Sequence, residues 1–331
     1  MSDFEVSVII PVYNAAAYVR QAVESALAQP EVREVLLVED GSPDNALEIC
    51  RQLASEYPKV VLLRHPNGEN RGAGASRNLG MKNASCEYLA FLDADDYYLP
   101  GRFAAASEIF RLDLACEGVY EAVGMQVESE EGMERWLSAG KSTSRLQTIS
   151  AGIKPEELAE ALLKGDQGYF LIAGLTIRRS ILEKTGLMNE DLRLHQDTEF
   201  IQRIALTSRL LPGRLNAPVA IWRVHAQNRI SSPLSPVQKL DNRLAMYHHL
   251  YSWCGKHARK YQKLLMPLML DNIISSARFL KNNPKPLQRK LLRLNNLLRY
   301  LAAKPYMLVD CNFWQALPGQ VNIARLGKGS Q

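Results

Sequence analysis

Runs of apolar residues alternate with amphipathic segments along the first hundred residues of the chain. Four runs have the β-branched or aliphatic character of strands that are buried on both faces, namely 6–12, 34–39, 60–64 and 88–92. Segments with apolar residues at helical spacing separate them, at 17–27, 45–56 and 72–81. This alternation predicts a doubly wound α/β fold, a Rossmann-like, mostly parallel sheet with flanking helices. Ligands of such a sheet gather at the carboxyl ends of its strands.

The pattern becomes less regular after residue 100. We expect a helix over 103–109, a surface excursion over the charged stretch 128–150, strand structure at 168–178 and a helix at 197–206. From 237 to 303, apolar residues recur at helical spacing and are interrupted by Pro267, Pro284 and Pro286, which predicts about three helices. The pattern therefore predicts an α/β domain over residues 1–235 and a basic helical C-terminal region over 236–331.

Composition narrows the class of protein. The chain has 331 residues, of which 47% are hydrophobic and 23% charged, the profile of an ordinary globular protein. No apolar run has the length of a membrane span or the form of a secretory leader. The five cysteines are scattered without metal-binding spacing, as expected for free thiols in a reducing compartment. We therefore expect a cytoplasmic location.

The net charge of +5 conceals two oppositely charged regions. Residues 236–304 contain fourteen Lys and Arg against two Asp, a balance of +12, whereas residues 1–235 carry −8. The basic region also has a leucine stripe, formed by Leu287, Leu291, Leu294, Leu298 and Leu301. The stripe fits three roles: contact with an anionic membrane surface, packing against the α/β domain with the charges solvated, or assembly of a homo-oligomer. The sequence leaves these three open.

Three carboxylates stand together where the fourth predicted strand ends, at Asp93, Asp95 and Asp96. Like charges at such short range raise one another's pKa and repel, so the cluster calls for a divalent cation or a shared proton between them. Taken alone, an Asp-rich segment after a strand is also an ordinary turn. The motifs around it are what distinguish the two interpretations.

Four motifs follow one another in the first hundred residues: VIIPVYN at 8–14, VEDGS at 38–42, NRG at 70–72 with SRNLG at 76–80, and FLDADD at 91–96. Each is common by chance, but in this order they closely resemble the family 2 glycosyltransferases of the glycosyltransferase-A fold. Weaker matches continue at 174–179, 186–188 and 196–203 and end with WRVH at 222–225. The resemblance therefore covers about two thirds of the chain and leaves out the basic region.

The resemblance implies a nucleotide-sugar donor, usually a UDP-sugar, held by residues 1–100, and an acceptor half over 101–235. Pro11 and Tyr13 end the first strand, where an aromatic ring can cover a flat base. Asp40 is expected to accept a hydrogen bond from the uracil ring. Tyr13 is equally consistent with plain packing, and Asp before Gly is also a common turn pair. Glu39 stands where many relatives have Asp, which weakens a direct contact with the ribose.

The resemblance also implies a cation at the acidic cluster. Mn²⁺ or Mg²⁺ is expected to bind Asp95 and diphosphate oxygens, while Asp93 meets the ribose or a water on the metal. His225 matches the histidine that completes the metal shell in many relatives, and an imidazole ligand favours Mn²⁺. Arg71 and Arg77 add positive charge near the diphosphate, although Arg77 can equally tie Asp93 in place.

An inverting transferase needs a carboxylate to take the proton of the acceptor hydroxyl, and Asp197 is the candidate. Gln196 replaces the Glu that precedes this position in the family, which removes a neighbouring negative charge. Glu199 is the second candidate. Asp197 can also be explained as the residue that caps the helix predicted at 197–206.

These observations predict a metal-dependent enzyme that moves a hexose or N-acetylhexosamine from a UDP-sugar to a glycan hydroxyl and leaves a β linkage. A lipid-linked acceptor would accord with peripheral contact at the inner face of the membrane. The first alternative is a degenerate relative that binds nucleotide sugar or glycan without turnover. A nucleic-acid role is not expected, because the basic region lacks a recognised motif and aromatic platforms. Nicotinamide binding is not expected either, since no glycine-rich turn follows the first strand.

Overall fold

The computed structural model describes residues 4–128, 130–138, 146–225, 236–275 and 286–317. The chain divides into two compact units, which are described separately here. The first comprises Met1–Asp191 and Gln196–Ser232, and the second Leu192–His195 and Pro233–Gln331. The predicted assignment of residues 1–100 to a donor and 101–235 to an acceptor stays a prediction.

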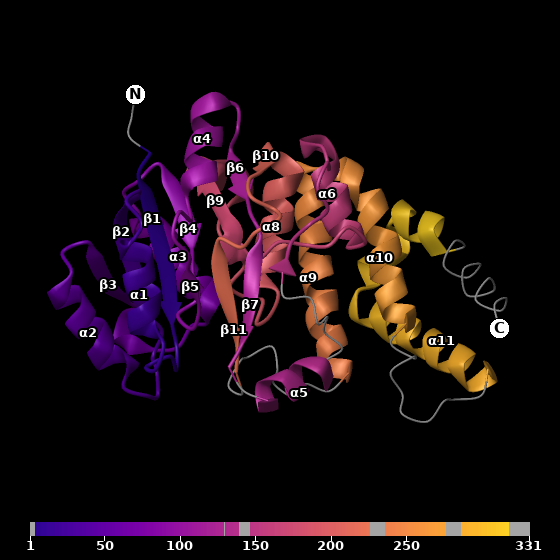
Figure 1. Ribbon diagram of the computed structural model, residues 1–331. Helices are drawn as coiled ribbons and strands as arrows, with labels where there is room; N and C mark the ends of the chain where they lie inside the picture. Colours follow the sequence, from indigo (N-terminus) through magenta and orange to yellow (C-terminus); the bar gives the residue numbers. More distant parts are fainter. Residues whose placement is uncertain (1–3, 129, 139–145, 226–235, 276–285, 318–331) are drawn as a thin grey trace. The chain divides into compact units, whose positions relative to one another are not determined.

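The first hundred residues fold as the hydrophobic pattern predicts (Figure 1). The elements are β1 (Val6–Val12), α1 (Val19–Leu27), β2 (Val32–Glu39), α2 (Ala46–Glu56), β3 (Val60–Arg64), η1 (Pro66–Gly68), α3 (Ala73–Asn83) and β4 (Tyr88–Phe91). All seven residues of β1 are buried, as a strand covered on both faces requires. Predicted and observed bounds of these strands and helices differ by no more than two residues.

The remainder of the first unit is a series of short elements. They are β5 (Tyr97–Tyr98), α4 (Ala104–Leu112), β6 (Gly118–Tyr120), β7 (Val123–Val127), α5 (Glu130–Ser138), β8 (Leu146–Gln147), α6 (Pro155–Lys164), η2 (Ile172–Gly174), β9 (Leu175–Arg178), α7 (Ile181–Thr185), α8 (Gln196–Thr207), β10 (Leu210–Pro212) and β11 (Ala220–Val224). The prediction that residues 128–150 form a segment on the surface is wrong in part. β8 pairs with β7, and Gln147 and Ile149 are buried, because this end of the segment completes a sheet.

Two sheets organise the unit. The larger has the strand order β10-β6-β9-β4-β1-β2-β3, and only β9 runs antiparallel to its neighbours. The smaller has the order β5-β11-β7-β8. In the larger sheet, Ile9 of β1 pairs with Phe91 of β4, and Val12 pairs with Glu39 of β2. The carboxyl ends of β1, β2 and β4 therefore meet at one edge.

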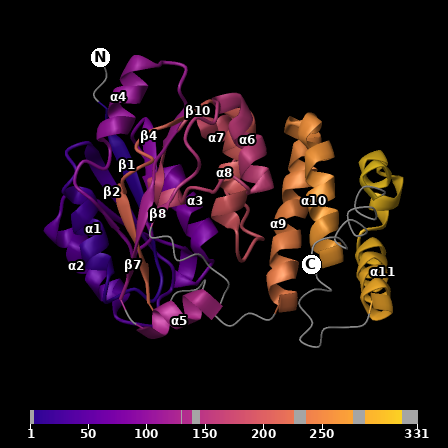
Figure 2. The same cartoon turned by 45° about the vertical axis from the view of Figure 1, so that its right-hand side comes forward.

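Helices cover both faces of the larger sheet (Figures 1 and 2). Val8 and Ile10 of β1 belong to a buried apolar cluster that includes α1. Ile9 points the other way, and a Cβ placed on Gly80 of α3 would lie 2.5 Å from its Cγ2 atom. Glycine at this position thus allows α3 to lie close against β1, and α3 begins at the edge where the three strands end.

The second unit is helical, with α9 (Pro236–His257), η4 (Arg259–Tyr261), α10 (Gln262–Ser275), α11 (Pro286–Ala303) and η6 (Pro305–Val309). This agrees with the three predicted helices, but Pro267 lies inside α10 instead of ending a helix. Leu265, Met266, Met269 and Leu270 around it are all buried, and this burial compensates for the backbone hydrogen bond that proline cannot make. Pro284 falls outside the described residues.

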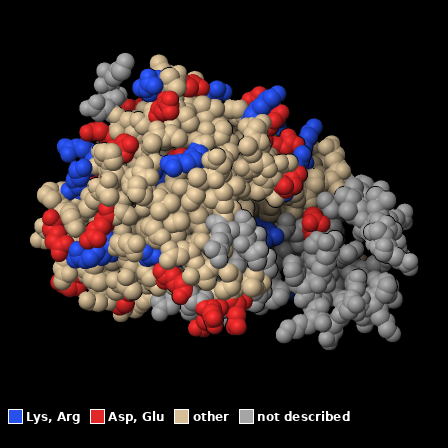
Figure 3. Space-filling view, viewed as in Figure 1, with Lys and Arg blue, Asp and Glu red and all other residues tan. Residues whose placement is uncertain are grey.

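The exposed charges of the first unit are mixed in sign on the face that Figure 3 shows. Exposed Glu130, Glu131 and Glu134 of α5 form an acidic group at its lower edge. In the second unit, Leu294 and Leu298 of the leucine stripe are 52% and 56% exposed. None of the helices in the described ranges is long and apolar enough to cross a membrane.

Candidate active site

The carboxylate of Asp40, at the end of β2, binds the backbone where α3 begins. Its Oδ1 atom accepts the amide hydrogen of Arg71 at 2.7 Å, and Oδ2 accepts that of Gly72 at 2.9 Å. Gly72 is the N-cap residue of α3 and has φ +89°, a conformation that favours glycine. Asp40 is 2% exposed, and the buried amide of Gly72 in particular depends on it for an acceptor. The predicted contact with uracil would have to use the remaining lone pairs of these oxygens.

Glu39 precedes Asp40, and both of its carboxylate oxygens also accept hydrogen bonds from the protein. Its Oε1 atom accepts the amide hydrogen of Ser42 at 2.6 Å, and Oε2 accepts Nε–H of Arg64 at 2.8 Å. Burial acts to raise the pKa of Glu39, but these two bonds outweigh it and hold the pKa below its ordinary value. The longer side chain found here in place of Asp thus ties the end of β2 to the end of β3.

Pro11 and Tyr13 lie where β1 ends. Val12 accepts a hydrogen bond from Asp40 on the β2 side, and Ile9 accepts one from Leu92 on the β4 side. Because successive residues of a strand turn their backbone groups to alternate sides, the nitrogen of Pro11 faces the β4 side. β4 ends before this point, so the N–H that proline lacks leaves no carbonyl of β4 without a donor. Tyr13 is 54% exposed and available to a flat ligand.

Arg77 of α3 forms an ion pair with Asp93, the first acid after β4. The guanidinium is 5% exposed and its pKa is raised: burial acts to lower it, but Asp93 and Asp197 stabilise the charge. The protein groups packed around the Asp93 carboxylate reduce its solvation and raise its pKa, which Arg77 opposes and Asp95 reinforces. The side chain of Asp93 is nonetheless 43% exposed, so it borders an open space.

Asp95 and His225 meet across the site. The Oδ2 atom of Asp95 lies 3.2 Å from Nε2 of His225, although 130 residues separate them. His225 directly follows β11 of the smaller sheet, and its ring stacks on Tyr18 with centroids 4.8 Å apart. The fold therefore brings together the two residues that were predicted as metal ligands.

Asp197 lies in the first turn of α8, next to this cluster. The negative charge of Asp197 acts to raise the pKa of both Arg77 and Asp93. Because α8 already begins at Gln196, Asp197 is not the residue that caps the helix. Its Oδ1 atom accepts the amide hydrogen of Thr198 at 2.8 Å, and the side chain remains partly exposed.

Glu199 is fully buried and accepts two hydrogen bonds from Arg203, at 2.7 and 2.8 Å. A carboxylate held in this way is a poor acceptor of a substrate proton, so Asp197 is the better candidate for the base. Gln196 is also buried, and a Cβ on Gly74 would lie 3.2 Å from its Cγ atom. The Gln that replaces the family's Glu therefore packs on α3.

Arg71 forms a partly exposed ion pair with Glu190, at 3.4 Å. The amide of Asn78 donates both to Glu190, at 3.0 Å, and to the backbone carbonyl of Met188, at 2.9 Å. Sequence reasoning missed Glu190 and Asn78. It also missed Arg223, although the WRVH motif placed it two residues before His225.

These motifs and contacts agree with the comparison to known families. The profile for Glycosyl transferase family 2 matches residues 7–184, more than half of the chain. The chain belongs to this family. The resemblance predicted from the motifs is thereby confirmed.

Two relatives show how far the family likeness extends. EpsJ of Bacillus subtilis, an uncharacterized glycosyltransferase, is 25% identical over 305 residues, which cover 87% of this chain and 83% of the relative. The succinoglycan biosynthesis protein ExoU of Rhizobium meliloti is 28% identical over 200 residues, which cover 60% of this chain and 56% of the relative. The match to ExoU thus spans little more than half of that protein.

Solved structures confirm the predicted fold class. The crystal structure of S. aureus TarS in complex with UDP-GlcNAc aligns with a TM-score of 0.55 and 18% identity, covering 95% of this chain and 79% of that one. A mannosyltransferase from Pyrobaculum calidifontis, in complex with GDP-Man and Mn²⁺, aligns with a TM-score of 0.51 and 16% identity, covering 96% and 86%. The family 2 chain therefore has the glycosyltransferase-A fold.

The residues at the end of β4 fit a divalent cation in part. Two adjacent ligands of an octahedral ion with bonds of roughly 2.1 Å lie about 3 Å apart, close to the 3.2 Å between Asp95 and His225. Among the described residues no group of three or more Asp, Glu, His or Cys side chains is arranged to hold a metal ion by itself. Substrate phosphates and water commonly supply the other ligands of Mg²⁺.

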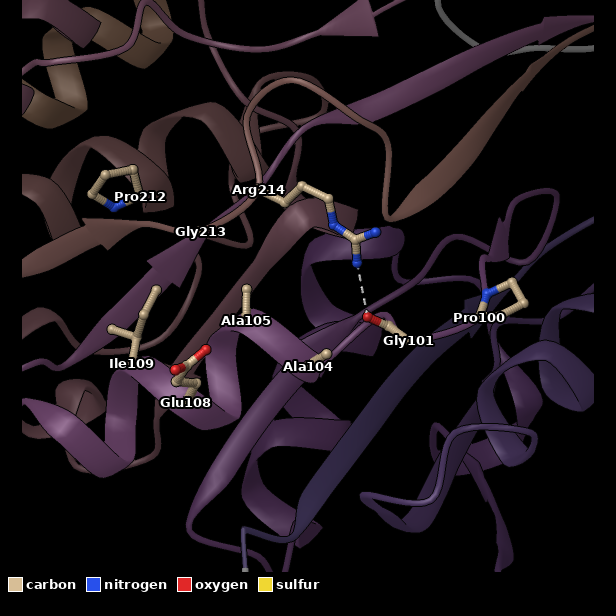
Figure 4. Close-up of a pocket in the computed structure, with 9 residues that line it drawn as sticks. All are labelled: Pro100, Gly101, Ala104, Ala105, Glu108, Ile109, Pro212, Gly213 and Arg214. Atoms are coloured by element: carbon tan, nitrogen blue, oxygen red, sulfur yellow. Dashed lines mark hydrogen bonds between the residues drawn. The ribbon is translucent and has the colours of Figure 1, made fainter.

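A shallow cavity of about 600 Å³ lies elsewhere on the family 2 domain, between α4 and the segment after β10 (Figure 4). Its lining is Pro100, Gly101, Ala104, Ala105, Glu108, Ile109, Pro212, Gly213 and Arg214. Arg214 crosses it and donates to the carbonyl of Gly101 at 3.0 Å. None of the predicted site residues lines this cavity, so it is distinct from the candidate active site.

Proposed function

We propose that this family 2 glycosyltransferase is a metal-dependent, inverting enzyme. It transfers a hexose or N-acetylhexosamine from a UDP-sugar to a glycan hydroxyl and forms a β linkage. The observation that carries the proposal is the meeting of Asp95 and His225 beside the Asp93–Arg77 ion pair. Asp197 lies near enough for its charge to act on that ion pair.

The names of relatives support the substrate class. ExoU is a succinoglycan biosynthesis protein, and the TarS structure contains UDP-GlcNAc. The mannosyltransferase structure, with GDP-Man and Mn²⁺, supports the use of a divalent cation. We infer from these that the chain acts in the synthesis of a cell-surface polysaccharide.

We propose a role for each side of the site. Asp95 and His225 would hold Mn²⁺ or Mg²⁺, which when bound neutralises the charge that develops on the leaving diphosphate. Arg71 is exposed enough to approach the same phosphates, and Arg77 holds Asp93 in place. Asp40 and Tyr13 stand at the neighbouring strand ends, where they would bind the uracil.

Asp197 would take the proton of the acceptor hydroxyl as its oxygen attacks the anomeric carbon. The attack occurs on the face opposite the diphosphate, so one displacement inverts the configuration and needs no covalent intermediate. Asp197 is suited to this because its carboxylate is partly exposed and, unlike Glu199, is not paired to an arginine in the observed contacts.

Incubation with a panel of nucleotide sugars tests the proposal. We expect release of UDP from one or more of UDP-GlcNAc, UDP-Glc, UDP-GalNAc and UDP-Gal in Mn²⁺, and loss of the release in EDTA. GDP-Man serves as the control donor. Release that persists in EDTA, or that occurs from GDP-Man alone, would contradict the proposal.

The alternative is a binding protein without turnover. It predicts that calorimetry detects binding of a UDP-sugar while neither hydrolysis nor transfer occurs with any acceptor glycan. The contacts of Asp95 and His225 favour the enzyme. A protein that only binds a nucleotide sugar does not need these two proposed metal ligands close to a partly exposed carboxylate such as that of Asp197.

The acceptor and the location are also proposals. Exposed Leu294 and Leu298 in α11, together with the charge of +12 over 236–304, suit an anionic membrane surface on which a lipid-linked acceptor would lie. Flotation with vesicles tests this: we expect binding to vesicles with anionic lipid and none to neutral vesicles. Sedimentation that shows a dimer and no vesicle binding would instead favour self-association.

A further inference from the structure

The backbone of Arg223, in β11, is hydrogen-bonded to the acidic turn at residues 93–96. Its amide donates to Oδ1 of Asp96 at 2.9 Å, and the amide of Asp96 donates to the carbonyl of Asp93 at 3.0 Å. β11 thus holds the turn that carries Asp95. His225 follows Arg223 by two residues, so the same short segment carries the second proposed ligand.

The side chain of Arg223 lies between two aromatic rings. Its guanidinium carbon is 5.1 Å from the ring centroid of Tyr18 and 4.8 Å from that of Tyr97. Its Nε atom lies 3.2 Å from a carboxylate oxygen of Glu128, and an Nη atom donates to Gln21. The side chain is only 3% exposed, so these contacts fix the plane of the guanidinium.

Tyr18 transmits this constraint to the imidazole. Its ring contacts the guanidinium of Arg223 and also stacks on His225, with an interplanar angle of 30°. The position of the His225 ring relative to Asp95 therefore depends on two connections that start at Arg223. One runs along the backbone to the acidic turn, and the other runs through the face of Tyr18.

We propose that Arg223 is a positioning residue that sets the geometry of Asp95 and His225 for the cation. The proposal rests on the proposed function, and it identifies Arg223 as a residue on which the metal affinity of the enzyme depends. A lysine would keep the charge but lose the planar fork and the stacking between rings. The partners of metal ligands commonly change metal affinity about 10- to 100-fold when they are removed.

Arg178 of β9 provides a matched control. Its guanidinium carbon also lies between two rings, 5.1 Å from Tyr88 and 5.3 Å from Phe110. It also has a carboxylate partner, Glu87, and donates to a backbone carbonyl at 2.9 Å. None of these partners belongs to the candidate active site, so Arg178→Lys measures the general cost of such a change.

The test is the affinity for Mn²⁺ without substrate turnover, measured from the electron paramagnetic resonance of free Mn²⁺ in the presence of UDP. We expect Arg223→Lys to weaken the affinity about 10- to 100-fold and Arg178→Lys to leave it within about twofold. In a His225→Ala background, Arg223→Lys is expected to cost less than about threefold, because its effect passes largely through the imidazole. Thermal unfolding of each variant confirms that it is folded.

Equal affinity in Arg223→Lys and the wild type would overturn the inference, as would a full additional loss in the His225→Ala background. If Arg223→Lys does not fold, Tyr18 carries the test instead. Tyr18→Phe keeps the ring and should retain affinity, whereas Tyr18→Leu should lose it, and equal affinities in these two would overturn the inference. If the wild type binds neither Mn²⁺ nor Mg²⁺, the proposed function itself fails.

Discussion

The ends of β2 and β4 carry two groups of acidic residues at the same edge of one sheet, but the contacts and pKa shifts of the two groups differ. After β2, all four carboxylate oxygens of Glu39 and Asp40 accept hydrogen bonds from the protein. After β4, Asp93 contacts an arginine, and Asp95 lies against an imidazole. The pKa of Glu39 is lowered, whereas that of Asp93 is raised because burial and Asp95 disfavour its charge.

From this difference we infer that the acids of β2 mainly stabilise the fold, whereas those of β4 are placed for the proposed chemistry. The carboxylate oxygens of the β2 acids all accept hydrogen bonds from backbone amides or from Arg64, so the protein already supplies their partners. The acids of β4 gather three carboxylates, and burial and its neighbours raise the pKa of Asp96 well above its ordinary value. An excess of negative charge of this kind is what a cation relieves. The same change of residue should therefore have different consequences at the two strand ends.

Asp95→Asn should have the largest effect on activity. Loss of one charged metal ligand removes several kcal/mol of stabilisation of the leaving group, so we expect transfer to fall on the order of 10³-fold or more. The unfolding temperature of the metal-free protein should stay the same or rise, because a like charge is removed from the cluster. Transfer assays with saturating Mn²⁺ measure the effect, and a loss smaller than tenfold would show that Asp95 is not a ligand.

Asp197→Asn extends the comparison to the carboxylate whose charge acts on the β4 acids. We expect transfer to fall by about 10²- to 10⁴-fold, the range for removal of a general base. Affinity for UDP with Mn²⁺ should remain within about twofold. Calorimetry that shows lost donor affinity would instead place Asp197 among the donor-binding residues.

Asp40→Asn is the matched change at β2 and should act on stability. The asparagine amide would face a buried backbone N–H of the Arg71–Gly72 turn, which leaves donors unpaired and costs about 1–3 kcal/mol. For a chain of this size each kcal/mol lowers the unfolding temperature by about 2–4 °C or less. Because Asp40 is also the proposed uracil contact, the donor-free protein is the one to measure. Unchanged stability would remove the distinction drawn between the strand ends.

The smallest effect is expected from Glu39→Gln, and it should depend on pH. Because the folded protein lowers the pKa of Glu39, its ionised form stabilises the fold above the unfolded-state pKa of about 4.3, and this stabilisation is lost as the pH falls through the lower, folded value. The variant should be less stable than the wild type at pH 7, and the difference should be smaller at pH 3. Urea unfolding at both pH values measures this, and a constant difference would contradict the assigned cause.

Much of the fold could be predicted because it rests on continuous local patterns. The four strands of the first hundred residues are mostly apolar runs separated by amphipathic segments, and their order in the sheet determines which ends share an edge. The short strands at 146–147 and 210–212 carry too few residues for a pattern. Pro267 was predicted to break a helix because its cost is local, while the burial that outweighs it comes from tertiary packing.

The site shows the same division. Asp93 and Asp95 were proposed from their position after a strand and His225 from the family resemblance, and the structure places Asp95 beside His225. The pairing of Asp40 with the start of α3 could not be predicted, because turn acids and ligand-binding acids look alike in sequence. Arg223 was missed for a related reason: its partner Tyr18 and its partners Asp96 and Tyr97 come from two segments far from it in the sequence, which only the folded chain brings together.

The central claim is that a divalent cation binds at the end of β4 and not at the end of β2. Crystals grown with UDP and Mn²⁺ test it directly through the anomalous scattering of manganese. The account predicts one peak bonded to the carboxylate of Asp95, to Nε2 of His225 and to diphosphate oxygens. A structure with UDP bound and no manganese there, or with manganese beside Glu39 and Asp40, would contradict it.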